Sequence, residues 1–226
     1  MTDSDQPALA IFDLDGTLTW HDTLLSFLAG YVGRNPGKLL HLWRLPGALL
    51  AFLLDGFDRG LLKSRVIKIV MEGDPKSEID AWADAFVQSM PARGLFRQAG
   101  LAILESHRRS GDRLILMSAS PDLYVPRIGQ LLGFELTLCT EIAWRAATPE
   151  ERLDGALSSP NLRGEEKLRC LQWLRGRYPG HTIFAYGNSA SDLAHLQQVE
   201  RPMLVNGNSR AQRMAARKRI PVGRWL

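Results

Sequence analysis

Two aspartates, Asp13 and Asp15, stand two residues apart where a short apolar run ends, and Gly16 follows them. One carboxylate of such a pair can act as a nucleophile while the other donates and accepts protons. Two negative charges beside a phosphate substrate require a compensating cation, and carboxylate oxygens suit Mg²⁺. An Asp-Gly turn with solvated acids is the alternative for Asp15 and Gly16 alone.

The elements that would position these acids alternate between strand and helix patterns. Apolar runs typical of buried parallel strands occur at 8–12, 113–117, 182–186 and, more weakly, 202–205. Helical patterns lie between them at 95–109, 123–132, 165–175 and 190–197. We therefore predict an α/β fold with a doubly wound, Rossmann-like parallel sheet. Ligands of such sheets bind beyond the carboxyl ends of the strands, where polar residues follow the first three runs.

Residues 20–92 interrupt this alternation with one helical pattern after another. The last of these, at 77–90, places its apolar residues on one face. We expect 20–92 to be a helical domain inserted into a core formed by 1–19 and 93–226. A smaller excursion at 140–163 contains two segments, 140–144 and 152–157, that could pair as a β-hairpin.

The string Phe-Asp-Leu-Asp-Gly-Thr-Leu-Thr at 12–19 resembles the signature of the haloacid dehalogenase-like superfamily, whose members are mostly Mg²⁺-dependent phosphohydrolases. The resemblance covers about residues 8–206 and includes three later motifs in the expected order. It implies that Asp13 attacks phosphorus to form an aspartyl-phosphate, and that Asp15 protonates the leaving oxygen and later activates water. Dehalogenases of the superfamily typically lack the second aspartate, so Asp15 favours phosphoryl chemistry.

The second motif of the superfamily is a Ser or Thr that ends the next core strand, and Ser118 matches it. The resemblance implies that the Ser118 hydroxyl binds a phosphoryl oxygen. The amides of Ala119 and Ser120 could assist if they lie at the N-terminus of a helix that begins near Pro121. Helix capping is another role for Ser118 or Ser120, and it is compatible with phosphate binding.

The third motif is a lysine on a later helix, and Lys167 resembles it by its place in the motif order. An ammonium group there would offset the charge that develops during phosphoryl transfer. An isolated helical lysine is more often solvated.

The fourth motif normally contains two acids, whereas this chain has Asn188 in place of the first and keeps Asp192. An amide oxygen can still ligate Mg²⁺, with one negative charge less. The resemblance therefore implies a magnesium site made by Asp13, Asp15, Asn188 and Asp192. The replacement at Asn188 also leaves open a protein that binds phosphate without catalysis.

The position of the helical insertion is similar to that of the C1-type cap in the phosphoserine-phosphatase-like branch. Such a cap closes over the site and selects the substrate. Asp22 stands where small-molecule phosphatases of this branch carry an acid that meets a substrate amine. The alternative is that Asp22 is the N-cap of a helix beginning at Thr23.

One segment of the insertion, Leu39–Leu54, is more apolar than a solvated helix should be, yet too short and interrupted for a confident membrane span. It is similar to the cap of bacterial phosphatidylglycerophosphatases of the superfamily, as is the Ser-Phe-Leu stretch at 26–28. That similarity implies a lipid phosphate, or peripheral contact with a membrane surface. A buried cap core and a dimer face are the alternatives.

The chain carries a net charge of +4 because basic residues are concentrated near its C-terminus. Residues 201–226 hold seven of the 28 basic residues and none of the 24 acidic ones, so the preceding 200 residues carry a net charge of −3. This distribution argues against a nucleic-acid partner, although the tail would fit anionic lipid headgroups or form the solvated face of a terminal helix. Two cysteines and a polar N-terminus without signal-peptide features favour the cytoplasm.

We therefore predict a Mg²⁺-dependent phosphatase for a small or lipid phosphomonoester, in the bacterial cytoplasm or peripheral to the inner face of the membrane. A non-catalytic phosphate- or membrane-binding protein and a phosphotransferase are the alternatives. The sequence leaves the oligomeric state and the particular ester open.

Overall fold

A six-stranded sheet with the order β3-β2-β1-β6-β7-β8 forms the centre of the computed structural model, which describes residues 7–225. All five strand pairings in this sheet are parallel. The strands are β1 (Leu9–Phe12), β2 (Arg113–Pro121), β3 (Leu136–Thr140), β6 (Ile183–Gly187), β7 (Arg201–Val205) and β8 (Val222–Gly223). This topology confirms the predicted doubly wound parallel sheet. Strands β2 and β3 lie on one side of β1, and β6, β7 and β8 lie on the other side. The carboxyl end of β1 is therefore the switch point at which such sheets bind ligands.

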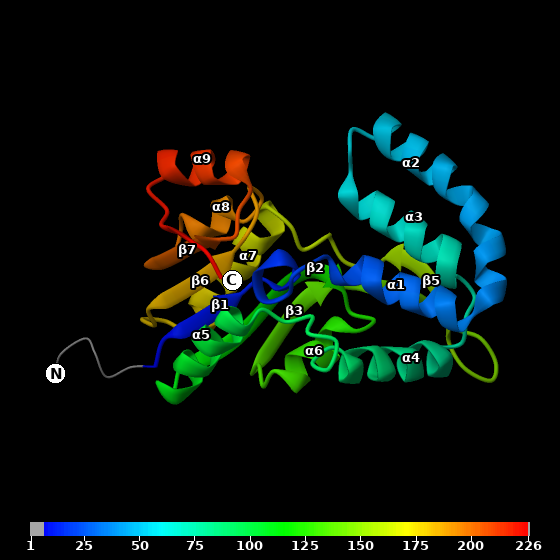
Figure 1. Ribbon diagram of the computed structural model, residues 1–226, viewed down its shortest axis with the longest axis horizontal. Coiled ribbons are helices and arrows are strands. Elements are labelled where there is room, and N and C mark those ends of the chain that lie inside the picture. The colour runs from blue at the N-terminus through cyan, green and yellow to red at the C-terminus, as the bar shows by residue number, and fades with distance from the viewer. Residues whose placement is uncertain (1–6, 226) are drawn as a thin grey trace.

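Helices cover both faces of the sheet, which explains why its inner strands are apolar throughout (Figure 1). Ala10 and Phe12 pack with α5 (Gln98–Arg109) and α6 (Val125–Leu131), whereas Leu9 and Ile11 pack on the opposite face. The helices on that second face are α7 (Glu165–Arg177), α8 (Leu193–Leu196) and α9 (Ser209–Arg217). Alternate residues of β1 therefore anchor two separate cores and fix the position of the loop that follows the strand.

The chain leaves β1 through a π-helical turn, η1 (Leu14–Leu18), and then forms a set of helices before α5. These are α1 (Thr23–Arg34), the 3-10 helix η2 (Pro36–Arg44), α2 (Leu45–Leu54), α3 (Arg59–Met71) and α4 (Lys76–Ser89). Figure 1 shows them beside the carboxyl end of the sheet. The segment 20–92 is thus helical from α1 to α4, as the sequence predicts.

The predicted hairpin forms from β4 (Ile142–Arg145) and β5 (Arg152–Leu157), which pair antiparallel. It joins the inserted helices rather than the main sheet, because the amide of Gly73 donates to the carbonyl of Leu153 at 2.9 Å. The amide of Lys76 likewise donates to the carbonyl of Glu151 at 2.9 Å. The hairpin is therefore bound to the loop between α3 and α4, and β5 packs against α3.

The prediction that a helix begins near Pro121 is wrong. Strand β2 continues through Pro121, which pairs with Thr140 of β3, and α6 begins only at Val125. Pairing with β3 therefore extends the strand past the point where the local sequence favours a helix start. As a result, the amides of Ala119 and Ser120 belong to the strand end and not to a helix N-terminus.

Candidate active site

A buried lysine joins two carboxylates at the carboxyl ends of β1 and β6. The Lys167 Nζ of α7 donates to Asp13 Oδ1 at 2.6 Å and to Asp192 Oδ1 at 2.8 Å. All three side chains are buried, and the second oxygen of Asp13 accepts a hydrogen bond from Thr17 Oγ1 at 3.1 Å. The three motif residues that the sequence separates by almost 180 positions are thus in direct contact. Lys167 is not a solvated helical lysine.

Burial and charge act differently on the three groups of this cluster. Desolvation raises the pKa of Asp13 to about 7, against the opposing effect of the Lys167 ammonium. Burial alone would raise the pKa of Asp192 as well, but the charge of Lys167 and the donors around this carboxylate hold it well below its usual range. The two carboxylates in turn raise the pKa of Lys167 although burial opposes this. Lys167 therefore stabilises the negative charges of both carboxylates, while burial opposes the charge of Asp13.

The Asp15 side chain connects the β1 loop to α1 and to the end of β2. Its Oδ1 accepts from the amide of Thr23 at 2.6 Å and from Thr23 Oγ1 at 2.7 Å, and its Oδ2 accepts from Ser120 Oγ at 2.6 Å. Burial raises the pKa of Asp15, and the neighbouring Asp22 adds to the rise. A carboxyl group with a raised pKa is better suited to donate a proton near neutral pH.

Ser118 lies near the carboxyl end of β2, shielded from solvent. It is completely buried, and its Oγ accepts a hydrogen bond from the amide of Ser120 at 3.0 Å. Ala119 and Ser120 line the cavity in front of it, and the carbonyl of Ala119 accepts from Thr140 Oγ1 at 2.8 Å. The binding of a phosphoryl oxygen by Ser118 and Ala119 stays a prediction. Ser120 is the serine that contacts Asp15.

Asn188 packs directly against the loop that carries the two aspartates. Gly16 has a φ of +77°, and a Cβ built on it would lie 2.0 Å from Asn188 Nδ2. Only glycine satisfies both this backbone conformation and this close approach. The Asn188 amide therefore lies against Gly16, the residue that follows Asp15, and lines the same cavity as the two aspartates.

The oxygen donors brought together here fit a hard divalent cation. Two carboxylates and an amide are ligands that Mg²⁺ accepts, with waters or substrate oxygens completing its shell. Over residues 7–225 no set of three or more His, Cys, Asp or Glu side chains is arranged to hold a metal ion. Asp13, Asp15 and Asn188 are therefore the residues that could hold Mg²⁺.

Both carboxylate oxygens of Asp192 are hydrogen-bonded, as are those of Asp13 and Asp15. Its Oδ1 is bound to Lys167, and its Oδ2 accepts from the amide of Ser189 at 2.9 Å, from Ser189 Oγ at 2.7 Å and from the amide of Asn188 at 3.3 Å. These contacts shape the 188–192 loop and hold Lys167. The role of Asp192 as a direct metal ligand stays a prediction.

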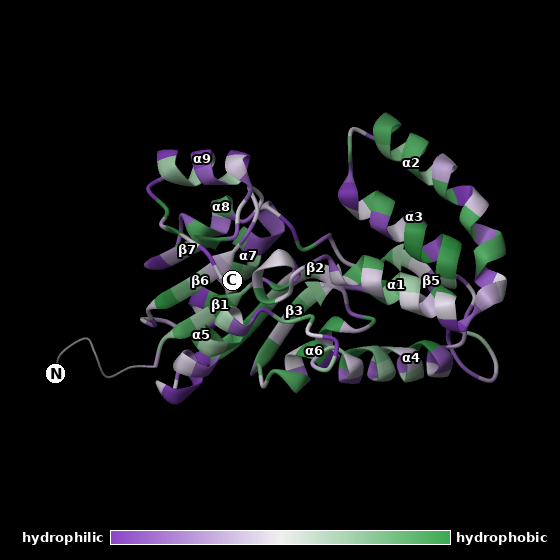
Figure 2. Ribbon diagram, viewed as in Figure 1, coloured by the Kyte–Doolittle hydropathy of each residue, from purple (hydrophilic) through white to green (hydrophobic). Residues whose placement is uncertain are grey.

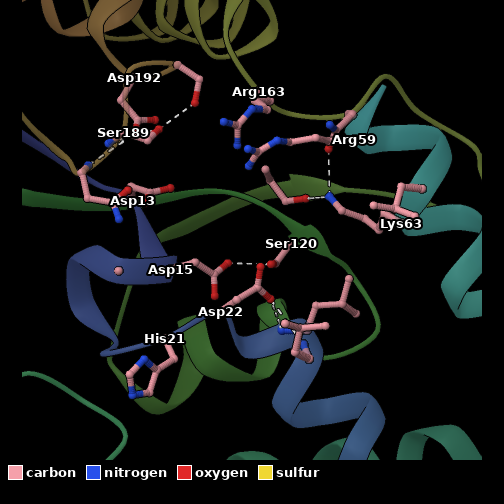
Figure 3. A pocket seen from close by; sticks show the side chains of 18 of the residues that line it. Asp13, Asp15, His21, Asp22, Arg59, Lys63, Ser120, Arg163, Ser189 and Asp192 are labelled. Carbon is pink, nitrogen blue, oxygen red and sulfur yellow. Dashed lines mark hydrogen bonds between the residues drawn. The ribbon is translucent and has the colours of Figure 1, made fainter. Parts of the chain in front are cut away.

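The candidate residues face a cavity of about 700 Å³ between the sheet and the inserted helices (Figure 3). Asp22 lines it and is also the N-cap of α1, because its Oδ1 accepts from the amide of Leu24 at 2.9 Å. This confirms the capping interpretation and keeps Asp22 at the site. The cavity is also lined by residues that the sequence motifs do not reveal, namely Arg59, Lys63, Asn161 and Arg163, with the apolar Leu25, Phe52, Leu62 and Val66.

Lys63 connects α3 of the inserted helices to the end of β2 and to the loop before α7. Its Nζ donates to Asn161 Oδ1 at 2.8 Å and to the carbonyl of Ala119. Burial lowers the pKa of Lys63 to about 8, although Asp15 and Asp22 oppose the shift. Arg59 and Lys63 are four residues apart on one helix, and this spacing is the only signal in the sequence that could have identified them.

The fold places the chain among α/β proteins whose ligands bind at the switch point of a doubly wound parallel sheet. More particularly, the chain belongs to the haloacid dehalogenase-like hydrolase family, whose sequence pattern matches residues 10–197. Protein CicA of Caulobacter vibrioides is 32% identical over 187 residues, which cover 83% of this chain and 81% of that protein. The predicted family membership is confirmed.

Solved structures share this fold at low sequence identity. A Bordetella pertussis Tohama I protein of unknown function has a TM-score of 0.80 with 21% identity, covering 98% of this chain and 100% of that one. A substrate-bound phosphoserine phosphatase complex has a TM-score of 0.66 with 12% identity, covering 98% and 94% of the two chains. A phospho-aspartyl intermediate analogue of phosphoserine phosphatase has a TM-score of 0.65, also with 12% identity, and covers 98% and 95%. The chain therefore has the same fold as these solved phosphoserine phosphatases.

Proposed function

We propose that this protein is a phosphomonoester hydrolase in which Asp13 forms an aspartyl-phosphate. The observation that carries the proposal is the buried Asp13 carboxylate, held by Lys167 and Thr17 on the wall of a cavity large enough for a small ester. An Asp13 oxygen would attack phosphorus while Asp15 protonates the departing alkoxide oxygen. Asp15, now ionised, would take a proton from water, whose oxygen attacks phosphorus and releases phosphate from Asp13.

We further propose that Asp13, Asp15 and Asn188 hold Mg²⁺. The cation would neutralise phosphoryl charge and the repulsion between the phosphate and the aspartates. Lys167 would help to stabilise the same charge, since its Nζ lies 2.6 Å from Asp13 Oδ1. Ser118 and the amide of Ala119 remain the proposed phosphate-binding groups, and Asp22 the proposed contact to a polar part of the substrate.

Turnover of p-nitrophenyl phosphate is expected to require Mg²⁺. We expect EDTA to abolish release of p-nitrophenol and added MgCl₂ to restore it. Asn188→Asp restores a third carboxylate and should lower the Mg²⁺ concentration needed for half-maximal activity. An unchanged rate in EDTA would exclude the metal. No turnover of any phosphomonoester would favour a non-catalytic binding protein, and transfer to added alcohols without phosphate release would favour a phosphotransferase.

We propose that the inserted helices act as a cap. Arg59 and Lys63 of α3 and Leu25 of α1 line the cavity with Asp13, so these helices complete a site that the sheet leaves open on one side. The hairpin β4–β5 moves with them in this proposal, because it is hydrogen-bonded to residues 73–76.

The outer surface of η2, α2 and the start of α3 is strongly apolar. Leu40, Trp43 and Leu54 are 76%, 78% and 78% exposed. We call the whole set the apolar face; it comprises Leu39, Leu40, Trp43, Leu49, Leu50, Leu53, Leu54, Phe57 and Leu61. Figure 2 shows α2 as a largely hydrophobic helix at the edge of the molecule. The exposure of these residues excludes the buried cap core that was one alternative for Leu39–Leu54.

The charge around the apolar face indicates an anionic lipid surface as its partner. No acidic residue occurs between Asp22 and Asp55, whereas Arg34 and Arg44 lie in that segment. The third basic residue there, Lys38, is paired with Asp74 at 2.5 Å. Within the described chain, Pro36–Leu54 is the one helical stretch apolar and long enough to span a bilayer by composition, and only 6% of it is buried. An apolar face with a basic border is typical of helices that lie in a membrane interface. We therefore propose peripheral membrane docking and, as a substrate, the phosphomonoester of a lipid.

Vesicle binding tests this docking surface. We expect sedimentation with vesicles that contain phosphatidylglycerol, and at least about tenfold weaker binding for Leu40→Ser/Trp43→Ser, since each side chain buries apolar area worth about 1.5–3 kcal/mol. Leu131→Ser is the matched control, because Leu131 is an exposed leucine on α6. Equal binding by all three proteins would contradict the proposal. Loss of a dimer in the double variant, without vesicle binding by the parent, would instead assign the apolar face to self-association.

A further inference from the structure

The helix α9 carries a row of basic side chains on its outer side. Its inner side is held by Ala211 and Ala215, which are buried in the core on the second face of the sheet. The basic residues of the helix recur at intervals of three and four positions, so they share one side, and all of them are exposed. We call them, with the two residues that follow the helix, the basic face; it comprises Arg210, Arg213, Arg217, Lys218 and Arg219.

The charge of the basic face is not balanced by the protein around it. No acidic residue occurs between Glu200 and Trp225. Within the described residues 7–225, none of the five basic side chains forms an ion pair, whereas Arg175 on α7 pairs with Glu200 at 2.8 Å. Like charges gathered on one face repel each other, and an anionic surface that covers them would remove this repulsion. The basic face is therefore suited to an extended anionic partner.

The basic face and the apolar face lie on either side of a depression that adjoins the cavity. Phe57 of the apolar face lines this depression, and Ser191 lines both the depression and the cavity. Ser191 lies shortly before α8, and Gln197, directly after α8, accepts a hydrogen bond from Lys218 of the basic face. In Figure 1, α2 and α9 both lie along the upper margin of the molecule. One flat surface could therefore contact both faces.

We infer that the basic face binds the headgroups of anionic lipids and is a second contact in the membrane docking proposed above for the apolar face. The inference rests on that proposed docking and extends it from the inserted helices to α9. Guanidinium groups match the phosphate oxygens of such headgroups. A nucleic acid offers the same phosphates, but it has no hydrocarbon layer to receive the leucines of the apolar face. With both faces in contact, the depression beside Phe57 and Ser191 would open toward the bilayer.

Charge-neutral variants test the basic face by sedimentation with phosphatidylcholine vesicles that contain phosphatidylglycerol. We expect Arg213→Gln/Arg217→Gln to bind about 10- to 30-fold more weakly than the wild type, since each basic residue near an anionic surface contributes about fivefold. The matched control is Arg108→Gln/Arg109→Gln on α5, which Figure 1 shows at the lower margin and where both arginines pair with Glu105. This control should bind within about twofold of the wild type, because salt screens charges remote from the membrane.

Salt and the apolar-face variant separate the two contacts. Leu40→Ser/Trp43→Ser should keep a residual binding that requires phosphatidylglycerol and is lost at high salt, and adding Arg213→Gln/Arg217→Gln should abolish it. Unchanged far-ultraviolet circular dichroism in every variant excludes unfolding of α9 as the cause. Wild-type binding by Arg213→Gln/Arg217→Gln, with Leu40→Ser/Trp43→Ser still impaired, would overturn the inference and leave the proposed docking intact. Binding of the wild type to a DNA duplex but to no vesicle would overturn both.

Discussion

Replacing Asp13 by asparagine is expected to reduce turnover of p-nitrophenyl phosphate by about 10⁴-fold or more, which is the scale for loss of a catalytic nucleophile. The amide is nearly the same size as the carboxylate. Its oxygen can still accept from Lys167, whose Nζ lies 2.6 Å from Asp13 Oδ1, and its NH₂ group can donate to Thr17 Oγ1, which lies 3.1 Å from the other oxygen. It cannot, however, attack phosphorus as a carboxylate does. The loss should therefore appear in kcat while the fold is kept.

Steady-state kinetics and circular dichroism of the purified variant check this prediction. Asp84→Asn is the matched control, because Asp84 lies on the exposed side of α4 in an ion pair with Arg127. It should retain full activity. Activity of the Asp13 variant within about tenfold of the wild type would show that another group is the nucleophile.

Replacing Lys167 by methionine is expected to affect both catalysis and stability. The substitution keeps the length of the side chain but leaves Asp13 and Asp192 buried without their cation. Removing one partner of a buried ion pair costs about 3–5 kcal/mol, and the lost ammonium should also lower kcat by about 10²-fold or more. The free energy of unfolding, measured with urea, and the rate with p-nitrophenyl phosphate report the two effects separately.

The double variant Lys167→Met/Asp192→Asn distinguishes these effects. Neutralising Asp192 removes one of the two uncompensated charges, so part of the lost stability should return while activity does not. An unfolding free energy of Lys167→Met within about 1 kcal/mol of the wild type would contradict the importance of this buried cluster.

The sheet could be predicted from the sequence because its strands are covered on both faces. Their apolar runs are therefore continuous, and the parallel arrangement brings the ends of β1, β2 and β6 to one edge. The contact between Asp13, Lys167 and Asp192 follows from this arrangement. The start of α6 could not be predicted, because the pairing of Pro121 with Thr140 depends on a strand that follows later in the chain.

For the inserted helices, the local sequence pattern predicts the helices themselves but not which of their side chains are buried, exposed or directed into the cavity. Periodicity identified α3 and α4 but not the side that faces the sheet, so Arg59 and Lys63 were missed. The apolar segment at Leu39–Leu54 has the composition of a buried helix, and only its packing shows that leucines such as Leu50 and Leu54 are exposed. Asp22 illustrates the intermediate case, since its capping role is local and its place in the cavity depends on the fold.

The identity of the nucleophile can be tested by trapping the covalent intermediate. The enzyme would be mixed with excess p-nitrophenyl phosphate, quenched in acid within the first turnovers and treated with borohydride, which reduces an acyl-phosphate to an alcohol. Peptide mass spectrometry should then find the reduced side chain at position 13 in the wild type and at no position in Asp13→Asn. A wild-type enzyme that turns over but yields no modified Asp13, or that is modified at another carboxylate, would contradict the proposed mechanism.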